Sequence, residues 1–262
     1  MDSKKVLLIW LDIIGGQVII FIEEVGIIIS LFFRSVKGIF FPPLNIRNIL
    51  KQMEEVGVNS LPVVLITALS TGMVLALQSY NGFKRFGAET LVGTVVALSM
   101  TRELGPVLTG LIVSGRAGAS MAAELGTMKV TEQIDALATM AVNPVKYLIV
   151  PRLIAGMIML PILTIFADVI GIGGGYFVGV RMLDINSVVY MKKTTEYLEL
   201  DDIFGGILKA CIFGIIISTI SCYKGFTTEG GAEGVGKSTT GAVVISSMLI
   251  LISDYFLTAI FF

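Results

Sequence analysis

Long apolar runs separated by short polar stretches set the pattern of this 262-residue chain. A bilayer core of about 30 Å needs roughly 20 apolar residues in a helix, and the runs come close to or exceed that length. The polar stretches between them contain the Gly, Asn and charged residues typical of turns. The pattern predicts five membrane-spanning helices, at residues 61–78, 91–123, 151–180, 203–221 and 243–262.

The second predicted span is longer than a bilayer is thick. Residues 91–123 would extend roughly 50 Å as a helix rising about 1.5 Å per residue. Such a helix must tilt, kink or protrude, and we expect a kink at Pro106. Lys and Arg are more frequent at the amino end and in the 124–152 and 224–237 segments, which favours a cytoplasmic location for all three.

The first 44 residues predict a separate element, an amphipathic helix lying in the membrane interface. Residues 6–33 are apolar enough to span, but polar residues recur along one narrow side of the helix, and carboxylates at membrane depth are costly. Pro42 and Pro43 end this helix, and residues 45–262 form the membrane domain. The polar stripe consists of Lys5, Asp12, Gly16, Glu23, Ser30, Arg34 and Lys37.

Composition supports the membrane assignment and argues against several functions. Hydrophobic residues make up 55% of the chain, charged residues 15%, and the mean hydropathy is +0.88, values unsuited to a soluble domain of this length. A net charge of −1 gives no basis for a nucleic-acid partner. The chain has no histidine, so we expect no metal, no cofactor and no catalytic site. Cys211 and Cys222 are interpreted as small apolar core residues.

Small residues recur every four positions on two predicted spans. In lipid, such ridges let helix backbones approach and gain dispersion contacts. They pack either within one subunit or, for one ridge, across a homodimer interface. The ridges are Gly110, Ser114, Gly118, Ala122 and Gly126 on the second span and Ala167, Gly171, Gly175 and Gly179 on the third.

Arg102 and Glu103 lie inside an apolar run of the second span. Charges at this depth face a protein interior or a wet cavity. Lys209 and Asp254 are available as structural partners on other spans. The alternative is a cavity for a ligand with an apolar body and a charged head, and the residues leave both interpretations open.

A short polar segment at 128–137 predicts an amphipathic helix with Thr127 as its N-cap. Its apolar positions Val130, Ile134 and Leu137 follow helical spacing. The helix either decorates the surface or docks into a groove of a soluble partner. Docking explains better why a ten-residue polar helix separates two spans.

Residues 231–238, GAEGVGKS, match the phosphate-loop pattern GxxxxGK[ST]. A working phosphate loop follows a buried strand in an α/β domain and opens a helix. Here the preceding apolar run is a membrane span, and no second nucleotide motif occurs. We interpret the match as chance.

Three stretches carry a family signature: RELGPVLTGLIVSGRAGASMAAELGTMKVTEQIDAL from residue 102, AVNPVKYLIVPR at 141–152 and FTTEGGAEGVGKSTTGAVV at 226–244. From about residue 57 to the carboxyl end, the chain resembles the MlaE family of ABC-transporter permeases. The family includes the YrbE permeases and the permease of the chloroplast lipid importer. The resemblance implies an all-α, ABC-exporter-like homodimer, with an interfacial helix and five membrane helices per subunit.

The resemblance also implies partners and cargo. It implies a cytoplasmic ABC ATPase, often with a STAS-domain subunit, and a periplasmic MCE-domain protein. The implied cargo is phospholipid, moved between the inner and outer membranes to maintain outer-membrane lipid asymmetry. The chain would then be a multi-pass protein of the cell inner membrane without its own ATPase activity.

Site residues follow from the same resemblance. Arg102 and Glu103 fall where the family lines its lipid pocket, and Lys237 stands where its members commonly have Arg. Further pocket residues are Leu75, Gln78, Phe83 and Phe86. Residues 127–138 become the coupling helix that enters the ATPase, through Met128, Lys129, Glu132, Gln133, Ile134, Asp135 and Leu137.

Two other function classes compete with this assignment. An intramembrane lipid-modifying enzyme needs a nucleophile and a base. Ser114 and Ser120 are available, but without histidine a Ser-His dyad is impossible. A secondary transporter would follow an ion gradient, and the polar loop helix and the absence of an internal repeat argue against it.

Overall fold

The computed structural model describes residues 3–41 and 45–261, and it describes side-chain surroundings from residue 15 onward except at 17 and 21. Within these residues every regular element is a helix. Five helical segments are long and apolar enough to cross a membrane, which confirms the predicted number and order of spans. They are Ile46–Phe86, Glu89–Val130, Val145–Met182, Leu200–Phe226 and Gly231–Phe261.

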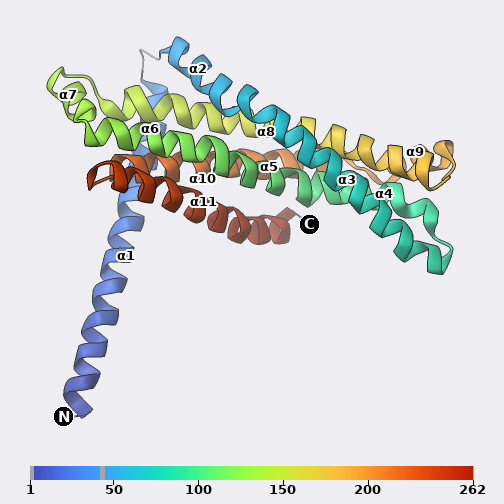
Figure 1. Ribbon diagram of the computed structural model, residues 1–262, viewed down its shortest axis with the longest axis horizontal. Helices are drawn as coiled ribbons and strands as arrows, with labels where there is room; N and C mark the ends of the chain where they lie inside the picture. The colour runs from blue at the N-terminus through green and yellow to red at the C-terminus, as the bar shows by residue number, and fades with distance from the viewer. Residues whose placement is uncertain (1–2, 42–44, 262) are drawn as a thin grey trace.

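The five spans run side by side along the long axis of the molecule (Figure 1). Helix α8 (Val150–Phe177) packs between α3 (Leu61–Phe83) and α10 (Leu200–Phe226), and α11 (Gly231–Phe261) packs on α10 and α6 (Ala119–Val130). Two short helices mark the ends of the bundle (Figure 1). We call these the α7 end, after Gln133–Thr139, and the α9 end, after Ser187–Tyr197.

Helix α2 (Ile46–Val56) leads through a short 3-10 turn at Val58–Ser60 into α3. Arg116 of the second span holds this junction, because its Nη1 donates to the Glu55 carbonyl at 2.7 Å and to the Ser60 hydroxyl at 3.0 Å. Helix α2 is therefore tied directly to the bundle.

The second span is divided by two π-helical turns. Helices α4 (Val92–Ser99), α5 (Gly105–Val113) and α6 are separated by π turns at Met100–Leu104 and Ser114–Gly118. The first π turn lies just before Pro106, where the sequence predicts a kink. Proline has no N–H to donate, so the helix leaves a carbonyl of the preceding turn without its usual partner.

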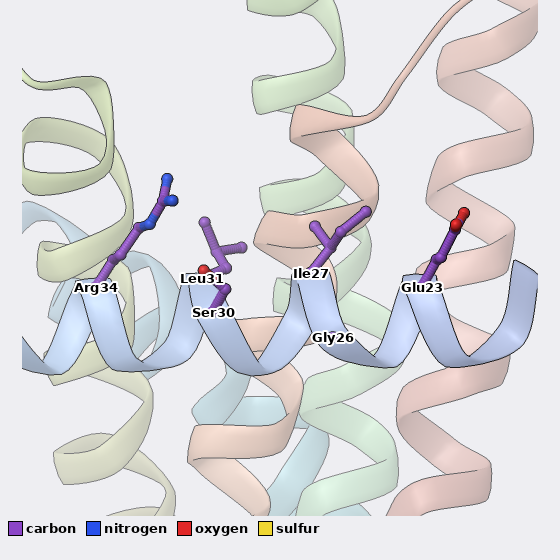
Figure 2. A pocket seen from close by; sticks show the side chains of 6 residues that line it. All are labelled: Glu23, Gly26, Ile27, Ser30, Leu31 and Arg34. Carbon is purple, nitrogen blue, oxygen red and sulfur yellow. The ribbon is translucent and has the colours of Figure 1, made fainter. Parts of the chain in front are cut away.

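Helix α1 (Ser3–Phe40) runs across the bundle at the α7 end and extends well beyond its edge (Figure 1). It contacts α8, α10 and the π turn η6 (Val145–Ile149). Glu23 and Arg34 point to the same side of α1 (Figure 2). These two members of the predicted polar stripe therefore share one side of the helix. The side chains of its members Lys5 and Asp12 lie outside the described residues, as do Pro42 and Pro43.

The predicted helix at 128–137 is wrong in its bounds. Helix α6 continues to Val130, the chain turns at Thr131 and Glu132, and α7 begins only at Gln133. Thr127 is not an N-cap, because its hydroxyl donates to the Ala123 carbonyl (2.8 Å) within α6. Glu132 makes the turn with a φ of 60°. This left-handed conformation is uncommon for residues other than glycine, so the sequence gives no sign of it.

The glycine-rich stretch between the fourth and fifth predicted spans is not the turn that its composition predicts. Helix α10 ends at Phe226 and α11 begins at Gly231, so only 227–230 lie outside helices. Glycine disfavours helices, but packing of α11 on α6 and α10 overrides that preference. The phosphate-loop match lies in the first two turns of α11, and a helical backbone directs its N–H groups along the axis rather than around an anion.

Candidate functional site

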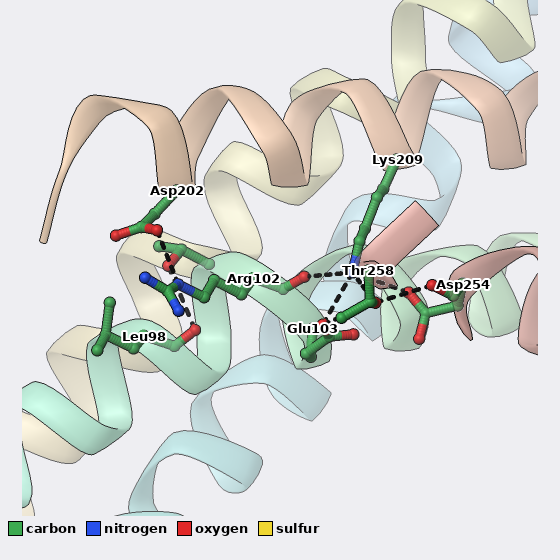
Figure 3. Close-up of polar contacts among 8 residues, drawn as sticks. Leu98, Arg102, Glu103, Asp202, Lys209, Asp254 and Thr258 are labelled. Atoms are coloured by element: carbon green, nitrogen blue, oxygen red, sulfur yellow. Dashed lines mark hydrogen bonds and ion pairs between the residues drawn. The ribbon is translucent and has the colours of Figure 1, made fainter. Parts of the chain in front are cut away.

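A cluster of charged side chains lies inside the bundle where η4 (Met100–Leu104), α10 and α11 meet (Figure 3). The π turn supplies Arg102 and Glu103, and α10 supplies Lys209. Two residues not predicted for this site, Asp202 and Thr258, complete it together with Asp254.

Arg102 forms an ion pair with Asp202 of α10. The Arg102 Nε donates to Asp202 Oδ1 at 2.7 Å. Asp202 is held in turn by its own helix start, because its Oδ2 accepts the Glu199 N–H at 3.1 Å. Asp202 is buried, whereas the Arg102 side chain keeps 38% of its surface exposed.

Lys209 is the centre of the cluster, and its side chain is 0% exposed. Its Nζ donates to Glu103 Oε1 at 2.9 Å and to the Thr258 hydroxyl at 2.7 Å, and it forms an ion pair with Asp254 Oδ1 at 3.1 Å. It also donates to the Arg102 carbonyl at 2.9 Å. That carbonyl lies four residues before Pro106, so Lys209 supplies a donor that the proline lacks.

A close helix crossing brings Lys209 to this position. A Cβ added at Gly206, one turn earlier on α10, would collide with the Thr101 carbonyl oxygen. Only glycine allows the two backbones to come this close. The local sequence, with Pro106 on one helix and Gly206 on the other, therefore sets the geometry of the cluster.

The cluster holds two cations against three carboxylates in a bundle surrounded by lipid. Buried charges are stable only when paired and hydrogen-bonded, so the network has a structural role. Glu103, like Arg102, remains partly open, with 37% of its side chain exposed. The structural pairing of Glu103 with Lys209 thus coexists with a surface that a ligand can reach.

The other four predicted pocket residues lie at the α9 end of the first span. Leu75 and Phe83 pack against the core cluster that contains Val92 and Tyr190. Gln78 and Phe86 are exposed. None of the four cavities described in one subunit is lined by these side chains together with Arg102. The lipid pocket therefore stays a prediction.

The predicted coupling residues divide into two faces. Ile134 is only 5% exposed and, with Met128 and Leu137, packs against Leu125 and Leu148 of its own subunit. The opposite face is polar and exposed. It consists of Glu132, Gln133, Asp135 and Lys129, whose Nζ lies 3.1 Å from Asp135 Oδ2.

Arg152 links the helices that flank α7. Its Nη2 donates to Glu124 Oε2 of α6 at 2.6 Å, and its Nη1 donates to the Leu148 carbonyl at 2.7 Å. Arg152 is 3% exposed, whereas Glu124 is 51% exposed. This pair ties α6 to α8 beside α7.

The small-residue ridges face neighbouring helices of the same subunit. A Cβ at Gly110 would lie 3.4 Å from Phe213 of α10 and from Ile250 of α11, and one at Gly118 would lie 3.0 Å from Ser221. Ser114 and Ala122 are fully buried. On the third span, the ridge faces α3, α4 and α9. Neither ridge is open to a second subunit.

Comparison with known proteins gives consistent matches. The family model for Permease MlaE matches residues 49–260. A probable ABC transporter permease protein of Rickettsia typhi is 53% identical over 96% of this chain and 97% of its own length.

Two further relatives carry more specific names. The intermembrane phospholipid transport system permease protein MlaE of Haemophilus influenzae is 39% identical over 97% of each chain. The chloroplastic protein TRIGALACTOSYLDIACYLGLYCEROL 1 of Arabidopsis thaliana is 40% identical over 95% of this chain and 67% of its own length.

Proposed function

Because the chain belongs to the MlaE permease family, we propose that it is the membrane subunit of an ABC transporter that moves phospholipids between the inner and outer membranes. It is a multi-pass permease. Four further points are proposed: the cargo, its binding site, the source of free energy and the role in outer-membrane lipid asymmetry.

The observation that carries the proposal is the partly exposed Arg102 and Glu103 pair beside buried Lys209. A guanidinium binds phosphate through directed hydrogen bonds, and a carboxylate attracts the ammonium of a zwitterionic headgroup. Both groups are held in place by the network of α10 and α11, so they are preorganised for a headgroup. Leu75, Gln78, Phe83 and Phe86 would then form the walls around the lipid.

We place the completed pocket between two copies of the chain. None of the four cavities described in one subunit is lined by both Arg102 and Phe86, and a homodimer axis near α3 and η4 would close a pocket around them. The exposed apolar side of α3, which includes Val63, Ile66 and Val74, supports such an interface. The pocket around a lipid bound between two copies would change shape whenever the two subunits move relative to each other.

Free energy would come from a cytoplasmic ABC ATPase, assisted by a STAS-domain subunit where one is present. The polar face of α7 supports a docking role, because Glu132, Gln133 and Asp135 are exposed on a short helix between two spans. Movement of α7 would reach the second and third spans through the Arg152–Glu124 pair. An MCE-domain protein at the α9 end would receive the lipid.

Residues 1–44 are proposed to lie in the cytoplasmic interface of the cell inner membrane, and residues 45–262 to form the permease domain. The direction of α1 across the spans supports this placement (Figure 1). Large apolar side chains such as Ile19, Ile22 and Phe33 are exposed on α1, as expected for a helix in contact with acyl chains.

The test of the cargo site is the phospholipid that co-purifies with the chain. Arg102→Glu replaces the phosphate-binding group by a carboxylate and should reduce bound phospholipid several-fold, measured by mass spectrometry per mole of protein. Arg102→Lys keeps the charge and should retain more lipid than Arg102→Glu. Arg181→Glu, at an exposed residue of the α9 end, is the charge-matched control.

Equal lipid in wild type and Arg102→Glu, with both proteins monodisperse, would contradict the cargo site. It would leave Arg102 as a purely structural partner of Asp202.

A further inference from the structure

A second charged feature, separate from the Arg102 cluster, lies where α1 meets the α7 end of the bundle. A cavity of about 330 Å³ is lined by Arg34, Lys37 and Lys146, together with Gly38, Phe41, Asn143 and Val145. Three cations and no carboxylate line this cavity, which we call the basic pocket.

The basic pocket is built by close packing rather than by chance proximity of surface lysines. A Cβ at Gly38 would touch Val150 at 2.8 Å, so α1 is pressed against the start of α8. Across the gap, the Asn143 Oδ1 accepts the backbone N–H groups of Val145 (3.0 Å) and Lys146 (3.4 Å). These contacts fix the turn from which Lys146 projects.

The three cations form no ion pair in the part of the chain that the structure describes, although Arg34 also lines a neighbouring cavity together with Glu23. None of the ion pairs between described residues includes Arg34, Lys37 or Lys146. Glu23, the acidic residue on the same side of α1 (Figure 2), is three helical turns from Arg34, roughly 16 Å along the axis. The pocket therefore keeps a net positive charge.

The surroundings of the basic pocket are those of a lipid headgroup region. Phe40 and Phe41 are strongly exposed beside it, and phenylalanine is among the residues that interfacial helices bury at the boundary between headgroups and acyl chains. On another side of α1, Ile28, Ile29, Phe32 and Phe33 line an apolar groove with α10 and α11. A helix that is apolar on that side and basic at this pocket sits at the level of phosphate groups.

We propose that the basic pocket binds the phosphate of an anionic phospholipid from the cytoplasmic leaflet, as a site distinct from the cargo site. This inference rests on the proposed interfacial placement of α1 and not on the cargo assignment. Arg34 and Lys146 would hold the phosphate from two sides, and Lys37 would add charge at the rim. The bound lipid would fasten α1 to η6 and thereby to the segment that precedes α8.

The experiment measures lipid binding to the purified full-length chain in detergent by native mass spectrometry, titrating phosphatidylglycerol or phosphatidylcholine. Wild type should bind one phosphatidylglycerol per chain in preference to phosphatidylcholine. Arg34→Gln/Lys37→Gln/Lys146→Gln should weaken that event about a hundred-fold, because each Lys or Arg near an anionic headgroup contributes a factor of about five.

The control variant Arg85→Gln/Arg181→Gln/Lys192→Gln removes the same charge from exposed residues toward the α9 end, and should change the affinity by less than about threefold. Arg102→Glu should leave this binding event intact, which separates the basic pocket from the cargo site. If the triple variant at the pocket is not monodisperse, the single variants Arg34→Gln and Arg34→Lys are compared instead. Arg34→Gln should weaken binding, and Arg34→Lys, which keeps the charge, should restore it.

Three results would overturn the proposal. The first is equal binding of phosphatidylglycerol and phosphatidylcholine, and the second is unchanged binding in the pocket variant. The third is release of the lipid by millimolar inorganic phosphate at constant ionic strength, which would identify a site for free phosphate. Should the pocket variant keep its lipid but lose the soluble ATPase, the pocket belongs to a protein contact instead.

Discussion

The Arg102 cluster and the α7 end use charge in opposite ways. Inside the bundle, Lys209 is 0% exposed and bridges Glu103 and Asp254 on two different helices. At the α7 end, Lys129 and Asp135 form a single exposed pair on the protein surface. The first arrangement is centred on a cation that is shielded from water, and the second is a solvated contact.

The difference separates charges that hold the fold from charges that are available to partners. A buried charge that loses its partner keeps its full desolvation cost, whereas an exposed one is hydrated again. Substitutions in the cluster should therefore act on stability and binding together. Substitutions on the polar face of α7 should act on partner coupling alone.

The largest expected effect comes from Lys209→Met, which removes the central cation and leaves Glu103 and Asp254 without it. We expect a loss of about 3–5 kcal/mol in unfolding free energy. The measurement is an SDS unfolding titration of the purified chain in detergent micelles. Lys237→Met is the matched control on α11, because the Lys237–Glu233 pair is more than three-quarters exposed and contributes less than about 1 kcal/mol.

Similar losses in these two variants would remove the distinction between the two regions.

A smaller loss is expected for Arg152→Met at the α7 end. Arg152 is nearly as buried as Lys209, but its partner Glu124 is half exposed and becomes hydrated when the arginine is removed. Methionine also fills the space of the arginine stem without the buried Nε, which has no hydrogen-bond partner among the described residues. We expect a loss of about 1–2 kcal/mol in the same titration. A loss as large as that of Lys209→Met would show that partner exposure does not matter.

Tyr190→Phe should increase stability by about 1 kcal/mol at pH 7. Tyr190 on α9 is buried, and its hydroxyl has no hydrogen-bond partner among the described residues. Removing an unpaired buried hydroxyl recovers its desolvation cost. The same unfolding titration measures the gain, and a variant less stable than wild type would reveal an unrecognised contact of the hydroxyl.

Burial raises the pKa of Tyr190 from 10.0 to about 12. The unfolding free energy should therefore depend on pH in the alkaline range. Between pH 10 and 12 the unfolded chain releases the phenol proton and the folded chain keeps it, so the unfolding free energy falls as pH rises. The fall from this group amounts to about 2 kcal/mol. Tyr190→Phe should not show this part of the alkaline loss. The measurement is the change in unfolding free energy between pH 9 and pH 11.5, compared between wild type and the variant.

The smallest effect on stability is expected for Glu132→Lys/Asp135→Lys on the polar face of α7. Both side chains are exposed, so the unfolding free energy should change by less than about 0.5 kcal/mol. Stimulation of the ATPase by the permease should nevertheless be lost in the reconstituted complex. Unchanged stimulation would contradict the docking role of α7.

The sequence was sufficient for the spans because each is a long apolar run, and long runs have few alternatives in a bilayer. It was not sufficient for α7, because nothing in the run from Ala119 to Val130 ends a helix and the break at Glu132 depends on a left-handed backbone. The start of α11 was missed for the opposite reason. Its glycines predict a loop, and only tertiary packing makes them helical.

For the candidate site, the sequence predicted Arg102, Glu103, Lys209 and Asp254 as intramembrane charges but missed Asp202. That residue was assigned to a charged segment outside the membrane because it lies at the start of a span. A signal was present, since Asp202 and Lys209 are seven residues apart and share one face of α10. The adjacent pair on the second span can then meet both, as Figure 3 shows. The proposed closing of the pocket by a second subunit would leave no such signal in one sequence.

The most direct test of the account is ATP-driven transfer of a fluorescent phospholipid by the permease reconstituted in liposomes with the proposed ATPase and MCE-domain partners. The account predicts transfer that requires ATP, is lost in Arg102→Glu and is indifferent to an imposed ion gradient. Transfer that follows an ion gradient without the ATPase, or lipid modification by the purified chain alone, would contradict it.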